Sequence, residues 1–182
     1  MQKYWLAACL GIGSVLPAAA ECVIDGQGIH SLKLGQTLQQ VRQSFPAAVF
    51  ERTWDGDGIN LVRITLPDQI QILSRQDEGD EDVPINWQRK IIWLSTAEAR
   101  CRTADGIHPD MRLPQAADRL GGIERLILSE IESREYVLFK RQTPFNYRTQ
   151  DAGIYTDPER IPPAETTRYR QQAKITEISV YQ

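Results

Sequence analysis

The only two histidines of the chain, His30 and His108, each follow a Gly-Ile pair. Imidazole can ligate a metal ion or act as an acid–base group near neutral pH. No zinc-type spacing of cysteine or histidine is present in the chain. We therefore interpret both histidines as matching turn residues, and we expect no metal site, no cofactor and no catalytic pair.

The densest charge in the sequence is the acidic stretch 77–82, which holds five carboxylates. Paired carboxylates can cleave glycosidic bonds, but one of them must then lie in an apolar pocket. A run this hydrophilic is more typical of a solvated loop. It supports two hypotheses: an electrostatic contact with a basic partner, and a hydrolase of cell-envelope polymers as the alternative function.

The stretch WDGDGIN at 54–60 resembles part of a calcium loop, with Asp55 and Asp57 at the third and fifth ligand positions. The twelfth position would be Ile64, so the bidentate glutamate is missing. A glycine-rich hairpin turn explains the same residues, and we favour it. No nucleophile elbow, phosphate loop or dinucleotide fingerprint is present, so we expect no catalytic residues.

Residues 1–20 have the pattern of a cleavable secretory leader. Lys3 gives a positive start, residues 6–16 are uncharged and mostly apolar, and Ala18 and Ala20 fit the cleavage rule. The apolar run is too short to span a membrane. We expect cleavage between Ala20 and Glu21 and export to the periplasm, with no transmembrane segment.

The three cysteines have different expected roles. Cys9 lies in the leader after LAA, a sequence similar to a lipoprotein processing box, but the apolar region continues past it. We therefore do not favour a lipid anchor at Cys9. Cys22 and Cys101 remain after cleavage, and an even pair in an oxidising compartment predicts one disulfide. Neither lies in a histidine-containing nucleophile context, which disfavours a catalytic thiol.

The charge balance restricts the class of partner. The chain has 21 basic and 24 acidic residues and a formal net charge of −3. A nucleic-acid-binding face usually shows a basic excess, so we expect no nucleic-acid partner.

A first unit, residues 21–99, begins with a capping box at Thr37 and Gln40 and a short amphipathic helix after it. Alternating apolar residues predict a hairpin from 60–66 and 70–72. A last strand is predicted from Trp87 to Thr96.

A second unit, residues 100–182, repeats this pattern. Pro114 suits the first turn of a helix, and a hairpin is predicted from 125–131 and 135–141. The polar stretch 142–166 is expected to be irregular. The closing sequence KITEISVYQ repeats the spacing of KIIWLSTAE. The prediction is an α+β fold of two tandem units, each a short helix packed on an antiparallel β-sheet.

Two motifs carry a resemblance to known families. The stretch LGQTLQQVRQSF resembles a helical motif of the small barrel-assembly outer-membrane lipoproteins and of the secreted β-lactamase-inhibitor protein, itself a tandem repeat. The stretch RTADGIHPDM is similar to a segment of exported bacterial proteins in which a strand ends and a new helix begins. The resemblance implies a helix-plus-sheet fold and a binding role, and it carries no catalytic residues.

The last strand of the first unit predicts a binding face. Period-2 alternation places Ile92 and Leu94 toward the core, and it places Ile91 outward together with Trp87, Arg89 and Trp93. Arg63 is expected on the same outward side. Tryptophan and arginine are enriched at interface hot spots. We therefore expect a non-enzymatic periplasmic interaction module, an inhibitor or an envelope assembly accessory, that binds another envelope protein.

The leader predicts the first residue of the exported protein. Export should remove residues 1–20, because small residues stand at both positions that signal peptidase reads. The intact mass of the protein recovered from the periplasm should correspond to a chain beginning at Glu21. A lipidated product beginning at Cys9 would contradict the prediction.

Overall fold

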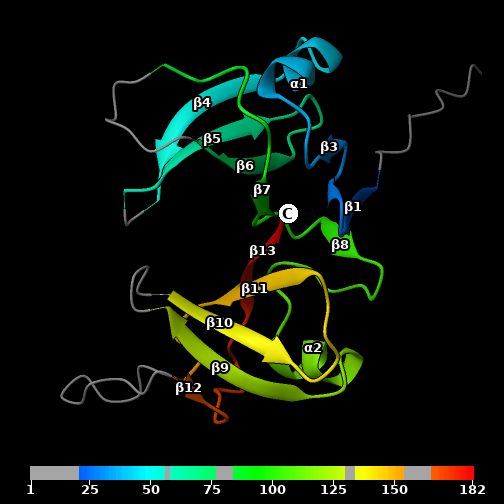
Figure 1. Cartoon of the computed structure of the whole chain (residues 1–182). Coiled ribbons are helices and arrows are strands. Elements are labelled where there is room, and N and C mark those ends of the chain that lie inside the picture. The colour runs from blue at the N-terminus through cyan, green and yellow to red at the C-terminus, as the bar shows by residue number, and fades with distance from the viewer. Residues whose placement is uncertain (1–20, 56–57, 77–83, 130–133, 154–164) are drawn as a thin grey trace, which may run out of the picture.

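The computed structural model describes residues 21–55, 58–76, 84–129, 134–153 and 165–182. Within them the chain has a mixed α+β fold, in which two short helices accompany mostly antiparallel strands (Figure 1). The predicted α+β class is confirmed. In the described part of the chain, no helix is long and apolar enough to cross a membrane.

The strands of the described residues form two sheets. The larger sheet has nine strands, in the order β12 (Glu165–Thr166), β9 (Ile123–Ser129), β10 (Arg134–Phe139), β11 (Phe145–Thr149), β13 (Ile175–Tyr181), β7 (Trp93–Thr96), β6 (Gln71–Arg75), β5 (Asn60–Thr65) and β4 (Val49–Trp54). The smaller sheet has four strands, in the order β3 (Leu32–Lys33), β2 (Gly28–Ile29), β1 (Cys22–Asp25) and β8 (Cys101–Thr103).

The first helix, α1 (Leu38–Ser44), begins at the predicted capping box. The Gln40 amide donates to Thr37 Oγ1 at 3.2 Å, and the Thr37 amide donates to Gln40 Oε1 at 2.8 Å. Two amides without a partner inside the helix are thus satisfied. Leu38 and Val41 lie one turn apart and are buried, which fixes the face that packs on the core.

The second helix, α2 (Leu113–Arg119), has Pro114 in its first turn, where a missing amide proton costs nothing. Ala116 and Ala117 are buried, and their small side chains allow close packing. The helix ends where Gly121 adopts a φ of 77°, a conformation that a side chain would disfavour.

The core lies on one face of the nine-stranded sheet. Buried residues from α1, α2 and the small sheet belong to one apolar cluster with inward residues of the large sheet, among them Val62, Ile64, Ile72, Leu94, Ile178 and Val180. Because side chains alternate along a strand, their sequence neighbours point to the opposite side. We call that side the open face.

Strands β7 and β13 form the centre of the large sheet. They pair antiparallel, with Leu94 opposite Val180 and Thr96 opposite Ile178. Strands β6, β5 and β4 follow on one side, and β11, β10 and β9 on the other. Figure 1 shows the result, a bent sheet with β4–β6 above this central pair and β9–β11 below it.

The disulfide joins the first strand to the start of the second half of the chain. Cys22 and Cys101 are bonded, as predicted, and their Cα atoms lie 4.3 Å apart. They stand opposite each other in the parallel pair of β1 and β8. Both are buried, so the bond lies within the core.

The strand predicted from Trp87 to Thr96 begins only at Trp93, and the predicted alternation is wrong before that point. Ile91 is fully buried, whereas Ile92 is 41% exposed. The reason is a backbone contact: the Ile91 amide donates to the Gln36 carbonyl at 2.7 Å. That contact binds the segment to the start of α1 and interrupts the two-residue period.

Several strands lie where the sequence indicated none, among them two that belong to the large sheet. Strand β4 precedes the predicted hairpin, and β11 lies within the stretch 142–166 that was expected to be irregular. Strand β11 reads FNYRT, with weak alternation, but it pairs with both β10 and β13. Its strand conformation therefore comes from its neighbours rather than from its own sequence.

Loss of the disulfide should destabilise the fold. Cys22→Ser should lower the free energy of unfolding by about 4 kcal/mol, because the bond restricts a long loop in the unfolded chain. Chemical denaturation of the variant and of the oxidised parent protein measures the difference. The parent under reducing conditions is the control and should show a similar loss. Two labelled thiols in the denatured, unreduced parent would contradict the bond.

Candidate functional site

The open face has a row of small polar side chains at its centre. Ser95 on β7 stands opposite Ser179 on β13, and Ser179 stands opposite Asn146 on β11. These side chains are shorter than those on either side along their strands. The floor of the open face is therefore low at the middle of the sheet.

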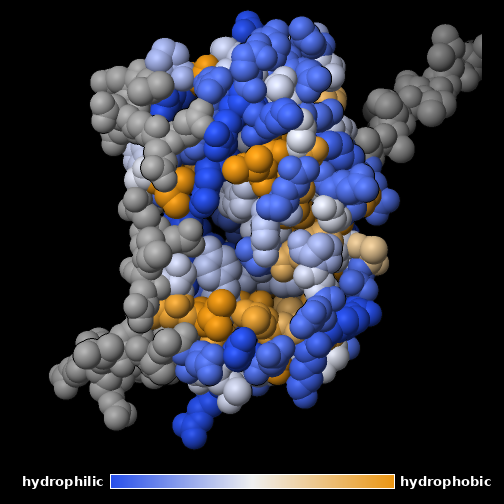
Figure 2. Space-filling model, viewed as in Figure 1, coloured by the Kyte–Doolittle hydropathy of each residue, from blue (hydrophilic) through white to orange (hydrophobic). Residues whose placement is uncertain are grey.

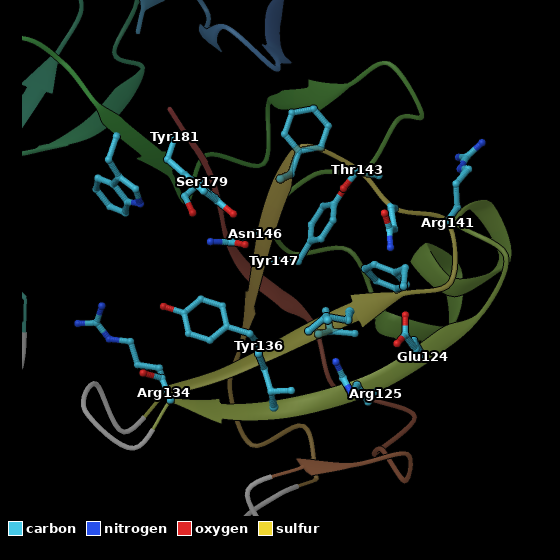
Figure 3. A pocket seen from close by; sticks show the side chains of 18 of the residues that line it. Glu124, Arg125, Arg134, Tyr136, Arg141, Thr143, Asn146, Tyr147, Ser179 and Tyr181 are labelled. Atoms are coloured by element: carbon cyan, nitrogen blue, oxygen red, sulfur yellow. The ribbon is translucent and has the colours of Figure 1, made fainter. Parts of the chain in front are cut away.

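Aromatic side chains stand around this floor. Trp93 and Tyr181 are direct partners on β7 and β13, and Tyr181 is 54% exposed. The Arg75 guanidinium lies 5.8 Å from the centre of the Trp93 ring, a cation–π arrangement. Tyr136 on β10 stands opposite Ile127 on β9. Figure 3 shows Tyr136, Asn146 and Ser179 pointing toward the same space.

The low floor and raised walls form two adjoining hollows, which we call the cleft. The larger hollow, of about 750 Å³, includes Trp93, Tyr136 and Tyr181 in its lining. The smaller, of about 190 Å³, includes Arg63 and Glu177. Figure 2 shows the molecule hollowed between its upper and lower lobes, with an apolar band on the lower wall. The larger hollow has the size of a typical ligand pocket.

An ion pair joins two strands that are distant in the sheet across the cleft. Arg134 Nη2 on β10 lies 2.9 Å from Asp55 Oδ2 at the end of β4, although five strands separate β10 from β4. Both side chains are nearly buried, at 12% and 10% exposure. The Ile59 amide also donates to Asp55 Oδ1 at 2.8 Å. The pair therefore bridges the two hollows, and both of its side chains belong to the lining of each.

A second charged pair lies inside the smaller hollow. Glu177 Oε2 lies 3.7 Å from Arg148 Nη1. Burial raises the pKa of the Glu177 carboxyl above its ordinary value of 4.5, and the neighbouring Arg148 guanidinium and Ser95 hydroxyl act in the opposite direction. The free-energy cost of removing this carboxylate from water is thus larger than the favourable interaction with the Arg148 guanidinium.

The four residues predicted to form one partner-binding face lie in different places. Trp93 lines the larger hollow and Arg63 the smaller one. Trp87 packs edge-on against Phe50 with ring centres 5.2 Å apart, and the Arg42 guanidinium of α1 lies 4.7 Å from its ring centre. Trp87 thus lies on the helix side of the sheet, and its placement beside Trp93 on one face was wrong.

The backbone of Arg89 also belongs to the segment that contacts α1. Its carbonyl accepts a hydrogen bond from the Leu38 amide at 3.2 Å, and its amide donates to the Asn86 carbonyl at 3.0 Å. The residue lies before β7 begins, so strand alternation does not determine its direction.

Sequence reasoning missed most of the cleft, including Arg75, Tyr136, Asn146, Ser179 and Tyr181. A signal existed for one of them, because Tyr136 alternates with buried neighbours along β10. Alternation shows which residues share a face of a strand, but not which strands are neighbours. Only the sheet order brings these side chains together.

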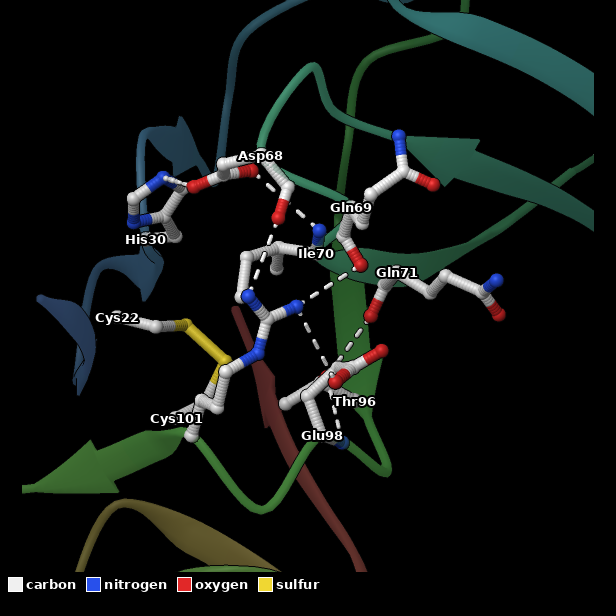
Figure 4. A network of polar contacts seen from close by, with 10 residues as sticks. Cys22, His30, Asp68, Gln69, Ile70, Gln71, Thr96, Glu98 and Cys101 are labelled. Atoms are coloured by element: carbon white, nitrogen blue, oxygen red, sulfur yellow. Dashed lines mark hydrogen bonds and ion pairs between the residues drawn. A yellow bond between two sulfur atoms is a disulfide. The ribbon is translucent and has the colours of Figure 1, made fainter. Parts of the chain in front are cut away.

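The two histidines have structural partners. His30 Nε2 lies 3.2 Å from Asp68 Oδ2, and Arg100 donates to the carbonyls of Asp68 and Gln69 at 3.1 and 3.0 Å. Figure 4 shows these contacts next to the disulfide. They hold His30 and Gln69 at positive φ, 54° and 65°, a conformation that costs about 1–3 kcal/mol for each residue.

His108 makes a separate contact, between its Nδ1 and the Pro109 carbonyl at 2.7 Å. In the described part of the chain, no group of three or more histidine, cysteine or acidic side chains is arranged to hold a metal ion. Asp57 of the calcium-like stretch and the acidic residues of 77–82 lie outside the described residues. Asp55 itself is paired with Arg134.

The fold and cleft describe a class of protein: a mixed α+β chain whose curved sheet leaves one face open. No known family matches the sequence, and no curated protein matches it. Among solved structures, the chain is similar to the uncharacterized protein yfeY from Escherichia coli, with a TM-score of 0.55 at 12% identity. The likeness covers 87% of this chain and 99% of yfeY, and it shows a shared fold.

Glu177 should make the stability of the protein fall as the pH rises. A raised pKa means that the folded protein binds more protons than the unfolded chain above pH 4.5, so this contribution is fully present below 4.5 and is lost at higher pH. The parent should therefore lose stability relative to Glu177→Gln as the pH rises. The free energy of unfolding of the variant minus that of the parent should increase from about pH 4 to pH 7. Denaturation at several pH values measures this.

Glu124→Gln is the control, because it removes an exposed carboxylate from the same sheet. The prediction would be contradicted if the free energy of unfolding of Glu177→Gln, minus that of the parent, fell as the pH rose.

Proposed function

We propose that this protein is an exported, non-enzymatic binding module of the periplasm, and that its cleft docks another envelope protein. The role is that of an inhibitor or of an envelope assembly accessory. Of the four residues predicted at the partner interface, Arg63 and Trp93 make contact in this proposal.

One observation carries the proposal: the open face exposes apolar side chains around a hollow. Tyr181 is 54% exposed and Ile92 is 41% exposed, and both line the larger hollow with the half-buried Trp93. Aromatic side chains in a concave patch are typical of interaction sites. An antiparallel sheet can leave one face in water, but a solvated face needs no tryptophan.

Export is supported by two features that agree. Residues 1–20 have a leader pattern. The buried disulfide between Cys22 and Cys101 belongs in an oxidising compartment such as the periplasm.

The tandem arrangement is part of the same proposal, with units at 21–99 and 100–182. In each half the residue before the helix bridges to a lysine near the last strand, Thr37 to Lys90 and Arg112 to Lys174. The strand order also reads alike outward from β7 and from β13. Two similar helix-on-sheet units that meet edge to edge produce this arrangement.

Tyr181→Ser tests the docking face. The side chain is exposed near the end of the chain, so the variant should keep the melting temperature of the parent. Capture of the envelope partner should fall by roughly thirtyfold or more, the effect of losing one interface hot spot. Affinity capture from envelope extracts, quantified by mass spectrometry against the parent protein, measures this loss.

The matched control is Val23→Ser, which removes an exposed apolar side chain from the small sheet. It should capture the same partner as the parent does. Equal capture by parent and Tyr181→Ser would show that the partner docks elsewhere.

A further inference from the structure

The cleft has a different charge from the rest of the chain. Among the described residues, six arginines and three carboxylates line its two hollows, whereas the whole chain carries a net charge of −3. The three carboxylates are Asp55, Glu124 and Glu177. The lining of the cleft is therefore cationic within an acidic protein.

Three of the cleft arginines pair with carboxylates that lie outside the lining of either hollow: Arg141 with Asp105 at 2.6 Å, and two others at longer distances. Arg63 pairs with Glu51 at 3.8 Å and Arg125 with Glu165 at 3.3 Å. The four side chains of these two longer pairs are between 41% and 61% exposed. Exposed ion pairs of this length contribute little to stability. An incoming carboxylate can therefore replace Glu51 or Glu165 with little loss.

The guanidinium group suits that replacement, because its planar donors match a carboxylate and can bind it with two hydrogen bonds. Beside these cations the larger hollow offers Trp93, Tyr136 and the exposed ring of Tyr181. An occupant that satisfies both features carries carboxylates together with an aromatic side chain. The concave shape selects a protruding segment rather than a flat surface.

We propose that the cleft binds a protruding acidic segment of the partner protein. Its carboxylates pair with Arg63 and Arg125, and its aromatic side chain enters the larger hollow beside Trp93 and Tyr136. This inference rests on the proposed function and names the chemistry of the partner. Arginines and aromatic rings also suit single-stranded nucleic acid, which is therefore the competing occupant that the experiment must distinguish from an acidic segment.

Calorimetry with cyclic peptides tests the proposal on the chain that begins at Glu21. The acidic probe is CDFEDGC, closed by its own disulfide, and the matched probes are CNFQNGC, without charge, and CDAEDGC, without the aromatic ring. The acidic probe should bind about tenfold more tightly than either matched probe at low salt. Its advantage over the uncharged probe should disappear between roughly 0.05 and 0.5 M salt.

Arg125→Gln should weaken the acidic probe about tenfold and leave the uncharged probe unchanged, since only the charged contact is lost. Arg102→Gln, on the exposed side of β8, is the control and should bind like the parent. Both variants should keep the parent's melting temperature, because both side chains are exposed.

Each other outcome overturns the inference. Equal binding of the acidic and uncharged probes would show an aromatic site without charge selection. That result would leave the proposed docking role of the cleft unaffected. Binding of a thymidine oligonucleotide in preference to the acidic probe would assign the cleft to nucleic acid. Absence of binding by all three peptides at millimolar concentration would also reject the acidic segment, while the Tyr181→Ser capture experiment still decides the docking face independently.

Discussion

The pairing of β7 with β13 is the interaction on which the rest of the structure depends. Residues 93–96 and 175–181 are far apart in the sequence, yet they form the middle of one sheet. Their inward side chains, including Leu94 and Val180, are fully buried. Without this pair, β7 and β13 would each keep one neighbour, β6 and β11, and become edge strands. Exposed strand edges tend to associate with other chains.

The same pair creates the cleft on the opposite face. Ser95 and Ser179 meet there because their neighbours Leu94 and Val180 face the core. The Asp55–Arg134 ion pair joins distant strands across this low centre. A buried ion pair adds little net stability, but removal of one partner is costly. Its structural effect is to join strands that are not neighbours in the sheet.

The cleft combines features that a purely structural sheet face does not need. Exposed rings lie beside guanidinium groups whose ion partners are themselves exposed. Such pairs keep the arginines oriented without binding them strongly. A partner that brings both carboxylates and an aromatic ring would find these groups already in position, which lowers the entropic cost of association.

The sequence by itself determined the local features. The capping box at Thr37 and Gln40, the proline in the first turn of α2, the hairpin of β5 and β6, and the cysteine pair each depend on a few residues and simple chemistry. These follow from hydrogen bonds and alternation within one segment, or from the redox state of the compartment.

Only the tertiary structure decided which face each residue occupies and which strands are neighbours. Ile91 and Ile92 exchanged their expected sides because Ile91 bonds to Gln36, a contact between distant segments. Strand β11 exists because β10 and β13 lie on both sides of it. The cleft gathers residues from at least five strands, and their order depends on the burial of the whole core, which no single stretch of sequence encodes.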